Sequence, residues 1–260
     1  MRQSDVLSDF ASEIGQGDMF KAHSFESVSV DEITISSEAS KILAKPKGRY
    51  FVLTFQRQSL DRKHLSEAMH KCVSSLISFK EGEKAMVIGL GNDSLVADSF
   101  GTSTARLIAT SVGSVISISP GVEGTTGLDS GAFVGIVANY ASPDAIVMLD
   151  SLYSNAPERM LECIQISNAP LSAGSGLDKK RDSLEKLPKA KAILSIGYTT
   201  TAGMDLKHVP AKSGTDSAQY SRHDTAVITP ADCDHYVRVI SEIAADVLNK
   251  SLAPIGGKTS

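Results

Sequence analysis

Two short apolar runs, each followed by an aspartate, constrain the fold of this chain most strongly. The run at 85–91 ends in glycines and is followed by Asp98, and the run at 145–149 stops at Asp150. Continuous apolar runs of this length are typical of strands buried on both faces, as in parallel sheets. Because ligands in open α/β sheets gather beyond the carboxyl ends of the strands, we expect both aspartates at one edge. Two carboxylates there can share a proton and activate a water molecule.

Strand and helix patterns alternate along the rest of the chain. Further strands are predicted at 28–35, 50–55, 115–119, 163–167 and 192–197, and helices at 61–80, 98–112, 131–141 and 231–250. Thr229 and Pro230 suit the cap and first turn of the last helix. The alternation predicts an α/β fold of three layers, with a mostly parallel sheet and helices on both faces. Since no clean linker interrupts it, we expect a single domain over 1–260, in which the polar residues 205–224 form a loop.

The composition argues against several classes of function. With 26 basic and 30 acidic residues, the net charge is −4 and no basic block stands out, so no direct nucleic-acid binding is expected. No apolar run approaches the roughly 20 residues that cross a bilayer, and the polar amino terminus lacks a signal core, which predicts a cytoplasmic protein. Cys72, Cys163 and Cys233 lie far apart and predict reduced thiols. The six histidines show no metal-binding spacing.

The two aspartates also allow structural roles. Asp98 could cap the amino terminus of a helix, where a carboxylate accepts hydrogen bonds from free N–H groups. Asp150 could begin a turn after its strand.

Two glycine motifs partly match known functional signatures. GLGN at 89–92 lacks the third glycine of a dinucleotide fingerprint, because position 94 is Ser94, and so predicts a tight turn. The GSG at 174–176 is not a nucleophile elbow, because Ala173 stands where that motif needs glycine. A flexible backbone near a ligand is therefore the expected use of these glycines.

Seven segments, taken in order along the chain, carry a family resemblance. They are KPKGRYFVLTF (45–55), GLGNDSLVADSFG (89–101), SPGVEGTTGLDS (119–130), LDSL (149–152), IQIS (164–167), AGSGLDKKR (173–181) and TPADCDHYVRVISEIAADVLNKSL (229–252). Together they resemble the spore germination protease family, whose members degrade small acid-soluble spore proteins. The chain departs from the family pattern at Ala97, Thr102, Asn155 and Asn168, where the family usually has two prolines, an arginine and an aspartate.

The resemblance implies an atypical aspartic endopeptidase with Asp98 and Asp150 as its catalytic pair and with no cofactor or metal. It implies a fold related to that of the hydrogenase maturation proteases, which is phosphorylase-like. Glycine-rich loops would bring backbone N–H groups close to an extended peptide. The expected substrate-binding residues are Gly124, Gly127, Gly174, Ser175 and Gly176.

The resemblance also implies a tetrameric zymogen. Residues 8–13 (SDFASE) are similar to the family's propeptide junction, in which an acidic residue precedes a large apolar one and then alanine. We therefore expect self-cleavage between Asp9 and Phe10, with 1–9 as the propeptide. The expected partners are small acid-soluble spore proteins as substrates and other copies of the chain in a homotetramer, within the forespore or spore core.

Two alternatives fit the same residues. A metal-dependent relative of the maturation proteases would hold nickel or another cation between Asp98 and Asp150, although no third ligand motif accompanies them. A non-catalytic homologue would retain the fold without the activity, because fold does not determine function.

Overall fold

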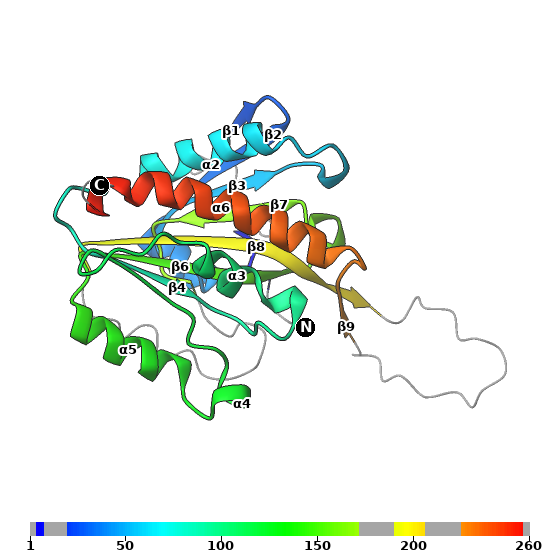
Figure 1. The fold of residues 1–260 in the computed structure, drawn as a ribbon. Helices are drawn as coiled ribbons and strands as arrows, with labels where there is room; N and C mark the ends of the chain where they lie inside the picture. Colours follow the sequence, from blue (N-terminus) through cyan, green and yellow to red (C-terminus); the bar gives the residue numbers. More distant parts are fainter. Residues whose placement is uncertain (1–3, 8–19, 172–189, 206–224, 257–260) are drawn as a thin grey trace, which may run out of the picture.

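The computed structural model describes residues 4–7, 20–171, 190–205 and 225–256. These residues are built on one sheet of nine strands (Figure 1). In spatial order the strands are β1 (Phe20–Phe25), β2 (Val28–Ile35), β3 (Gly48–Thr54), β7 (Cys163–Ser167), β8 (Ala192–Asp205), β6 (Ala145–Ser154), β4 (Ala85–Gly89) and β5 (Val115–Ile118). The last strand, β9 (Thr225–Ile228), pairs with the end of β8.

The sheet is mixed, so the α/β class is confirmed but the prediction of a mostly parallel sheet is wrong. The strands β5, β4, β6 and β8 are parallel to one another. All pairs from β1 through β2, β3 and β7 to β8, and the pair β8–β9, are antiparallel. Strand β7 is buried along its whole length and yet runs antiparallel to both neighbours. A continuous apolar run thus indicates burial on both faces and not the direction of the strand.

Helices cover both faces of the sheet (Figure 1). The helices α2 (Arg62–Leu76), α3 (Phe100–Arg106) and α6 (Cys233–Gly256) contribute to the largest core cluster on one face. On the other face, α5 (Ser130–Ala141) packs Val134 and Ala138 against β4 and β6, after the short helix α4 (Glu123–Thr126). Leu43 of α1 (Ser37–Leu43) belongs to a third cluster on that same face. The helices on both faces agree with the prediction.

Helix α2 follows from its apolar spacing. Asp61 caps it, since its carboxylate accepts hydrogen bonds from two N–H groups of the first turn. Its buried residues repeat at intervals of three and four: Leu65, Ala68, Met69, Cys72 and Val73. The helix ends earlier than the predicted 61–80, because Ile77 adopts an extended conformation and its side chain is buried in the core.

Helix α3 is shorter than the predicted 98–112, and a contact from a distant segment explains where it stops. The side-chain oxygen of Asn249, on α6, accepts a hydrogen bond from Ala109 N–H at 2.8 Å, and its Nδ2 donates to Leu107 O at 3.0 Å. The amide of Asn249 thus satisfies the backbone just beyond the helix end. Sequence spacing alone contains no information on this contact.

Helix α6 begins at Cys233, close to the predicted 231, and extends beyond the predicted 250. The expected roles of Thr229 and Pro230 as cap and first turn are wrong, because the helix begins only at Cys233. The Thr229 hydroxyl instead donates to Thr200 O at 2.9 Å and so ties β9 to β8. The strands β1 and β9 and the helices α1 and α4 were not predicted. None of the helices in the described residues is both long and apolar enough to cross a membrane.

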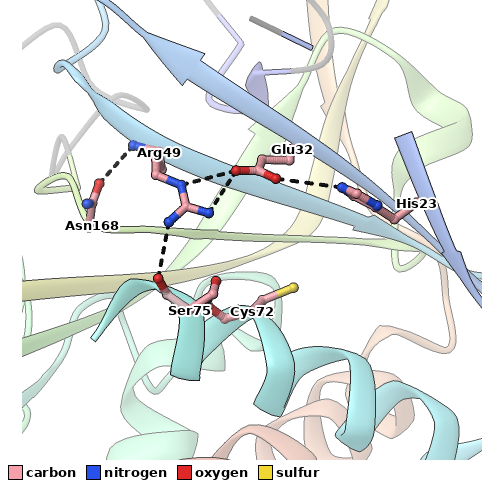
Figure 2. A network of polar contacts seen from close by, with 6 residues as sticks. All are labelled: His23, Glu32, Arg49, Cys72, Ser75 and Asn168. Carbon is pink, nitrogen blue, oxygen red and sulfur yellow. Dashed lines mark hydrogen bonds and ion pairs between the residues drawn. The ribbon is translucent and has the colours of Figure 1, made fainter. Parts of the chain in front are cut away.

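A polar network joins the antiparallel half of the sheet to α2 (Figure 2). Nε and Nη2 of Arg49 donate to Glu32 Oε1 at 3.1 and 2.8 Å, and Nη1 donates to Ser75 O at 3.2 Å. His23 Nε2 lies 3.6 Å from Glu32 Oε2. The backbone N–H of Arg49 also donates to Asn168 Oδ1 at 2.8 Å. Asn168, at a position where the family usually has aspartate, therefore has a structural role beside β3.

Candidate active site

Asp150 lies within β6 and not beyond it, so its role as the first residue of a turn is wrong. The strand continues to Ser154 because it pairs with β8 along its whole length. Its partner on the other side, β4, pairs with it only as far as Leu149. Asp150 and Ser151 keep part of their surface exposed between residues that are buried. The strand thus presents a carboxyl group where the sheet loses one of its neighbouring strands.

Asp98 ends a short 3-10 turn, Val96–Asp98, that follows β4. Its carboxylate does not cap α3; Oδ2 accepts a hydrogen bond from Asn92 N–H at 2.9 Å. Gly91 has φ +106° and packs so closely that a Cβ there would lie 2.0 Å from Asp98 O. Position 91 therefore requires glycine, and the GLGN segment is the predicted tight turn, folded around Asp98.

Two hydrogen bonds connect the turn of Asp98 to the strands beside it. The N–H of Phe100 donates to Ser151 Oγ at 3.3 Å, next to Asp150 in β6. The hydroxyl of Thr200, in β8, donates to Ala97 O at 2.5 Å. The structure thereby brings the two predicted catalytic residues into one neighbourhood, as the position of both segments at one edge of the sheet predicted.

The electrostatic environment of Asp150 is unusual. Burial raises its pKa well above the usual value, the negative charges of Asp98 and Asp5 raise it further, and a hydrogen bond from Ser151 N–H opposes the shift in part. That hydrogen bond reaches Asp150 Oδ1 at 2.9 Å. Close like charges and burial both favour the neutral form of a carboxyl group. Asp150 therefore retains its proton at a pH at which an ordinary aspartate has lost it.

Asp5 is a third carboxylate of this site that sequence reasoning missed. Its backbone N–H donates to Tyr153 O at 2.8 Å, and its Oδ2 accepts from Tyr153 N–H at 3.1 Å. The next two residues, Val6 and Leu7, are fully buried. Residues 4–7 are therefore packed against the site. A lone aspartate in a polar stretch carries no sequence signal for this position.

A pocket opens beside Asp150 on the face of the sheet that α1 covers. It is lined by Asp5, Lys45, Pro46, Tyr50, Asp150, Leu152, Gln165, Ser167, Pro170 and Leu171. Gln165 is only 6% exposed, which is low for an amide side chain in a strand of apolar residues. A buried polar residue inside the run at 163–167 was the one sequence signal that pointed to this pocket.

The expected substrate-binding glycines do not lie in this pocket as far as the structure describes them. Gly124 lies in α4 and Gly127 follows it with φ +69°, and a Cβ at either position would meet no atom within 4 Å. Gly174, Ser175 and Gly176 lie outside the described residues, as does the predicted cleavage site between Asp9 and Phe10. The roles of all these residues stay predictions.

In the described part of the chain, no group of three or more His, Cys, Asp or Glu side chains is arranged to hold a metal ion. The carboxylates of Asp5, Asp98 and Asp150 belong to that part and do not form such a group.

Comparison with known proteins identifies the family. The sequence model described as germination protease matches residues 2–205. The chain belongs to the germination protease family. The matched range includes both aspartates and ends before α6, whose similarity to the family's terminal helix therefore stays a prediction.

Curated relatives support the assignment. A germination protease of Clostridium perfringens is 29% identical over 194 residues, which are 67% of this chain and 60% of the relative. That of Clostridium tetani is 28% identical over 192 residues, 66% of this chain and 59% of the relative. That of Oceanobacillus iheyensis is 28% identical over 207 residues, 71% of this chain and 56% of the relative. The chain thus spans about three fifths of the length of the curated relatives it matches.

Proposed function

We propose that this chain is an endopeptidase in which Asp98 and Asp150 activate a water molecule. The observation that supports this most is the raised pKa of Asp150, which burial and the charge of Asp98 produce together. Asp98, in turn, accepts a hydrogen bond from Asn92 N–H at 2.9 Å, and the proposal assigns it the role of the ionised partner. One protonated and one ionised carboxyl group form a general acid and a general base in the same site.

The proposed reaction has two steps, each with two proton transfers. Asp98 takes a proton from water, the water oxygen attacks the carbonyl carbon of the peptide bond, and Asp150 gives its proton to the carbonyl oxygen. The tetrahedral intermediate then collapses. The C–N bond breaks as the nitrogen takes the proton held by Asp98, and a hydroxyl proton returns to Asp150. The products are a carboxylic acid and an amine, and both aspartates regain their initial protonation states.

The proposed substrates are small acid-soluble spore proteins, and membership of the family is the support for them. The proposal treats 1–260 as a single peptidase domain, related in fold to the hydrogenase maturation proteases and located in the forespore or spore core. It includes self-cleavage between Asp9 and Phe10. It also retains Gly124, Gly127, Gly174, Ser175 and Gly176 as substrate-binding residues.

The proposed assembly is a homotetramer. Helix α5 contains no charged residue, and its outer side exposes Phe133, Ile136 and Tyr140, at 37, 70 and 92%. Apolar side chains at this spacing on an exposed helix are typical of a surface that contacts another protein. Sedimentation velocity of Ile136→Asp beside the wild type tests whether this helix lies in the subunit interface.

The decisive experiment measures cleavage of a purified acid-soluble spore protein, with and without a chelator. Asp98→Asn and Asp150→Asn should each reduce the rate at least about 100-fold, because each replacement keeps the shape and removes a proton carrier. The control is Asp246→Asn, since Asp246 is exposed on α6. Near-normal cleavage by Asp98→Asn contradicts the mechanism. Loss of activity with chelator supports the metal-dependent alternative, and no cleavage by the wild type supports the non-catalytic one.

A further inference from the structure

Beside the candidate catalytic residues, none of the described strands pairs with one edge of β6. On this edge, β4 pairs with β6 only up to Leu149, whose carbonyl also accepts from Leu90 N–H at 2.8 Å. From Asp150 onward, none of the strands that the structure describes continues this pairing, while β8 still occupies the opposite edge. A strand edge of this kind offers N–H and C=O groups to an extended chain.

Residues 4–7 meet this edge at Asp5 and reach across the face of the sheet to Gln165 of β7. In three of their contacts, the atom that the segment contributes belongs to its backbone. The N–H of Asp5 donates to Tyr153 O at 2.8 Å. Lys45 Nζ donates to Ser4 O at 2.7 Å, and the N–H of Leu7 donates to Gln165 Oε1 at 2.8 Å. Contacts with backbone atoms do not depend on side-chain identity, so other polypeptides can make the same three hydrogen bonds.

The side chains of the segment supply a second, apolar element of recognition. Val6 and Leu7 are both fully buried and belong to the cluster that contains Leu43, Val52 and Leu152. Burying two such side chains removes apolar surface from water and so stabilises the docked segment. The groove therefore combines a backbone-binding edge with a surface for two adjacent apolar side chains.

We propose that this groove, formed by the β6 edge with Lys45 and Gln165, binds the polypeptide substrate in an extended conformation beside Asp150. Lys45 and Gln165 are positioning residues that hold the substrate backbone, and the preferred substrate carries two adjacent apolar residues. Residues 4–7 occupy the groove in this structure and compete with the substrate. This inference rests on the proposed peptidase function, since it assigns the substrate site of that activity.

The test is the binding of a labelled peptide with the sequence of residues 4–9, Ser-Asp-Val-Leu-Ser-Asp, measured by fluorescence anisotropy. The full chain with Val6→Ala and Leu7→Ala is used, because these substitutions weaken the docking of its own segment. Adding Lys45→Met or Gln165→Met should weaken peptide binding about tenfold, as expected for the loss of a buried hydrogen bond. Adding Lys47→Met, at an exposed lysine outside the pocket, should leave binding unchanged.

A second peptide, with both apolar residues replaced by serine, should bind at least about tenfold more weakly than the first. Thermal unfolding checks that each variant is folded. If the double alanine variant is not folded, Asp5→Pro replaces it, because proline removes the N–H that donates to Tyr153 and leaves Val6 and Leu7 in place.

The outcomes separate this inference from the proposed function. Saturable binding that depends on Lys45, Gln165 and the two apolar residues of the peptide supports the groove. If the protein then cleaves no substrate, only the peptidase function is contradicted. The groove is overturned if the protein cleaves a spore protein but does not bind the peptide. It is also overturned if the protein cleaves a spore protein and Lys45→Met and Gln165→Met leave peptide binding unchanged. Either result leaves the peptidase function in place.

Discussion

Replacing Gly101 by alanine should disturb both the stability of the protein and the relative position of its two candidate catalytic residues. Gly101 lies in the first turn of α3, directly after the turn that carries Asp98. A Cβ at this position would lie 2.3 Å from Leu149 O and 2.4 Å from Leu90 O. Both atoms are backbone oxygens, that of Leu149 within β6 and that of Leu90 directly after β4, so no side chain can rotate away to make room.

The size of the effect follows from these distances. A carbon atom and a carbonyl oxygen approach to about 3.3 Å, so α3 has to move by about 1 Å away from the strands. Overpacking of this kind costs about 1–3 kcal/mol, of which alanine regains up to about 1 kcal/mol through its higher helix propensity. We expect a net loss of about 1–2 kcal/mol in the free energy of unfolding. A displacement of about 1 Å between reacting groups lowers the rate about 100-fold.

Urea unfolding and cleavage of a spore protein measure the two effects. The matched control is Gly135→Ala in α5, where a Cβ would meet no atom within 4 Å. The control should stabilise the protein by up to about 1 kcal/mol and leave the cleavage rate unchanged. Equal stability of the Gly101→Ala variant and the wild type would refute the geometric argument, as would an equal loss of stability in the control.

Three further predictions concern charge and processing. The Asp150→Asn variant should be more stable than the wild type, because the raised pKa of Asp150 makes ionisation of this carboxyl group unfavourable in the folded protein. The difference in the free energy of unfolding should grow as the pH rises above the unfolded-state pKa of 3.8. Urea unfolding at several pH values measures this difference. Glu32→Gln should lower the free energy of unfolding by about 1–2 kcal/mol near neutral pH. Burial raises the pKa of Glu32, but the hydrogen bond and charge of Arg49 outweigh burial and lower the pKa below 4.5. The difference in the free energy of unfolding between Glu32→Gln and the wild type should therefore vanish as the pH falls through the lowered pKa. A difference that stays constant down to strongly acidic pH would contradict this prediction. Intact-mass spectrometry across mildly acidic to neutral pH should show cleavage between Asp9 and Phe10, and an unprocessed chain that still cuts substrate would rule this out.

The position of the aspartate pair shows what a local pattern can predict. The apolar runs that precede Asp98 and Asp150 are β4 and the first half of β6, and these strands are neighbours in the sheet. The pattern was informative because burial on both faces requires an unbroken apolar run, and because the chain has to leave such a strand at its carboxyl end. Neither condition depends on residues far away in the sequence.

The contacts of Asp5 and the position at which α3 ends are features that local sequence patterns do not predict. Asp5 and Tyr153 are hydrogen-bonded although they lie so far apart in the sequence that no local pattern connects them. The charge of Asp5 acts on Asp150 only because residues 4–7 fold back onto β6. The end of α3 likewise depends on Asn249 of α6. In both cases a polar group finds its partner only after the core has brought distant segments together.

The sequence by itself determined the α/β class, the helices on both faces and the two strands that present Asp98 and Asp150, because these features follow from local periodicity and burial. The tertiary structure alone decided the direction of β3 and β7, the raised pKa of Asp150 and the packing of residues 4–7 against β6 and β7. The physical reason is that strand direction, the desolvation of a carboxyl group and the occupation of a strand edge are all set by contacts between segments that are far apart in the chain.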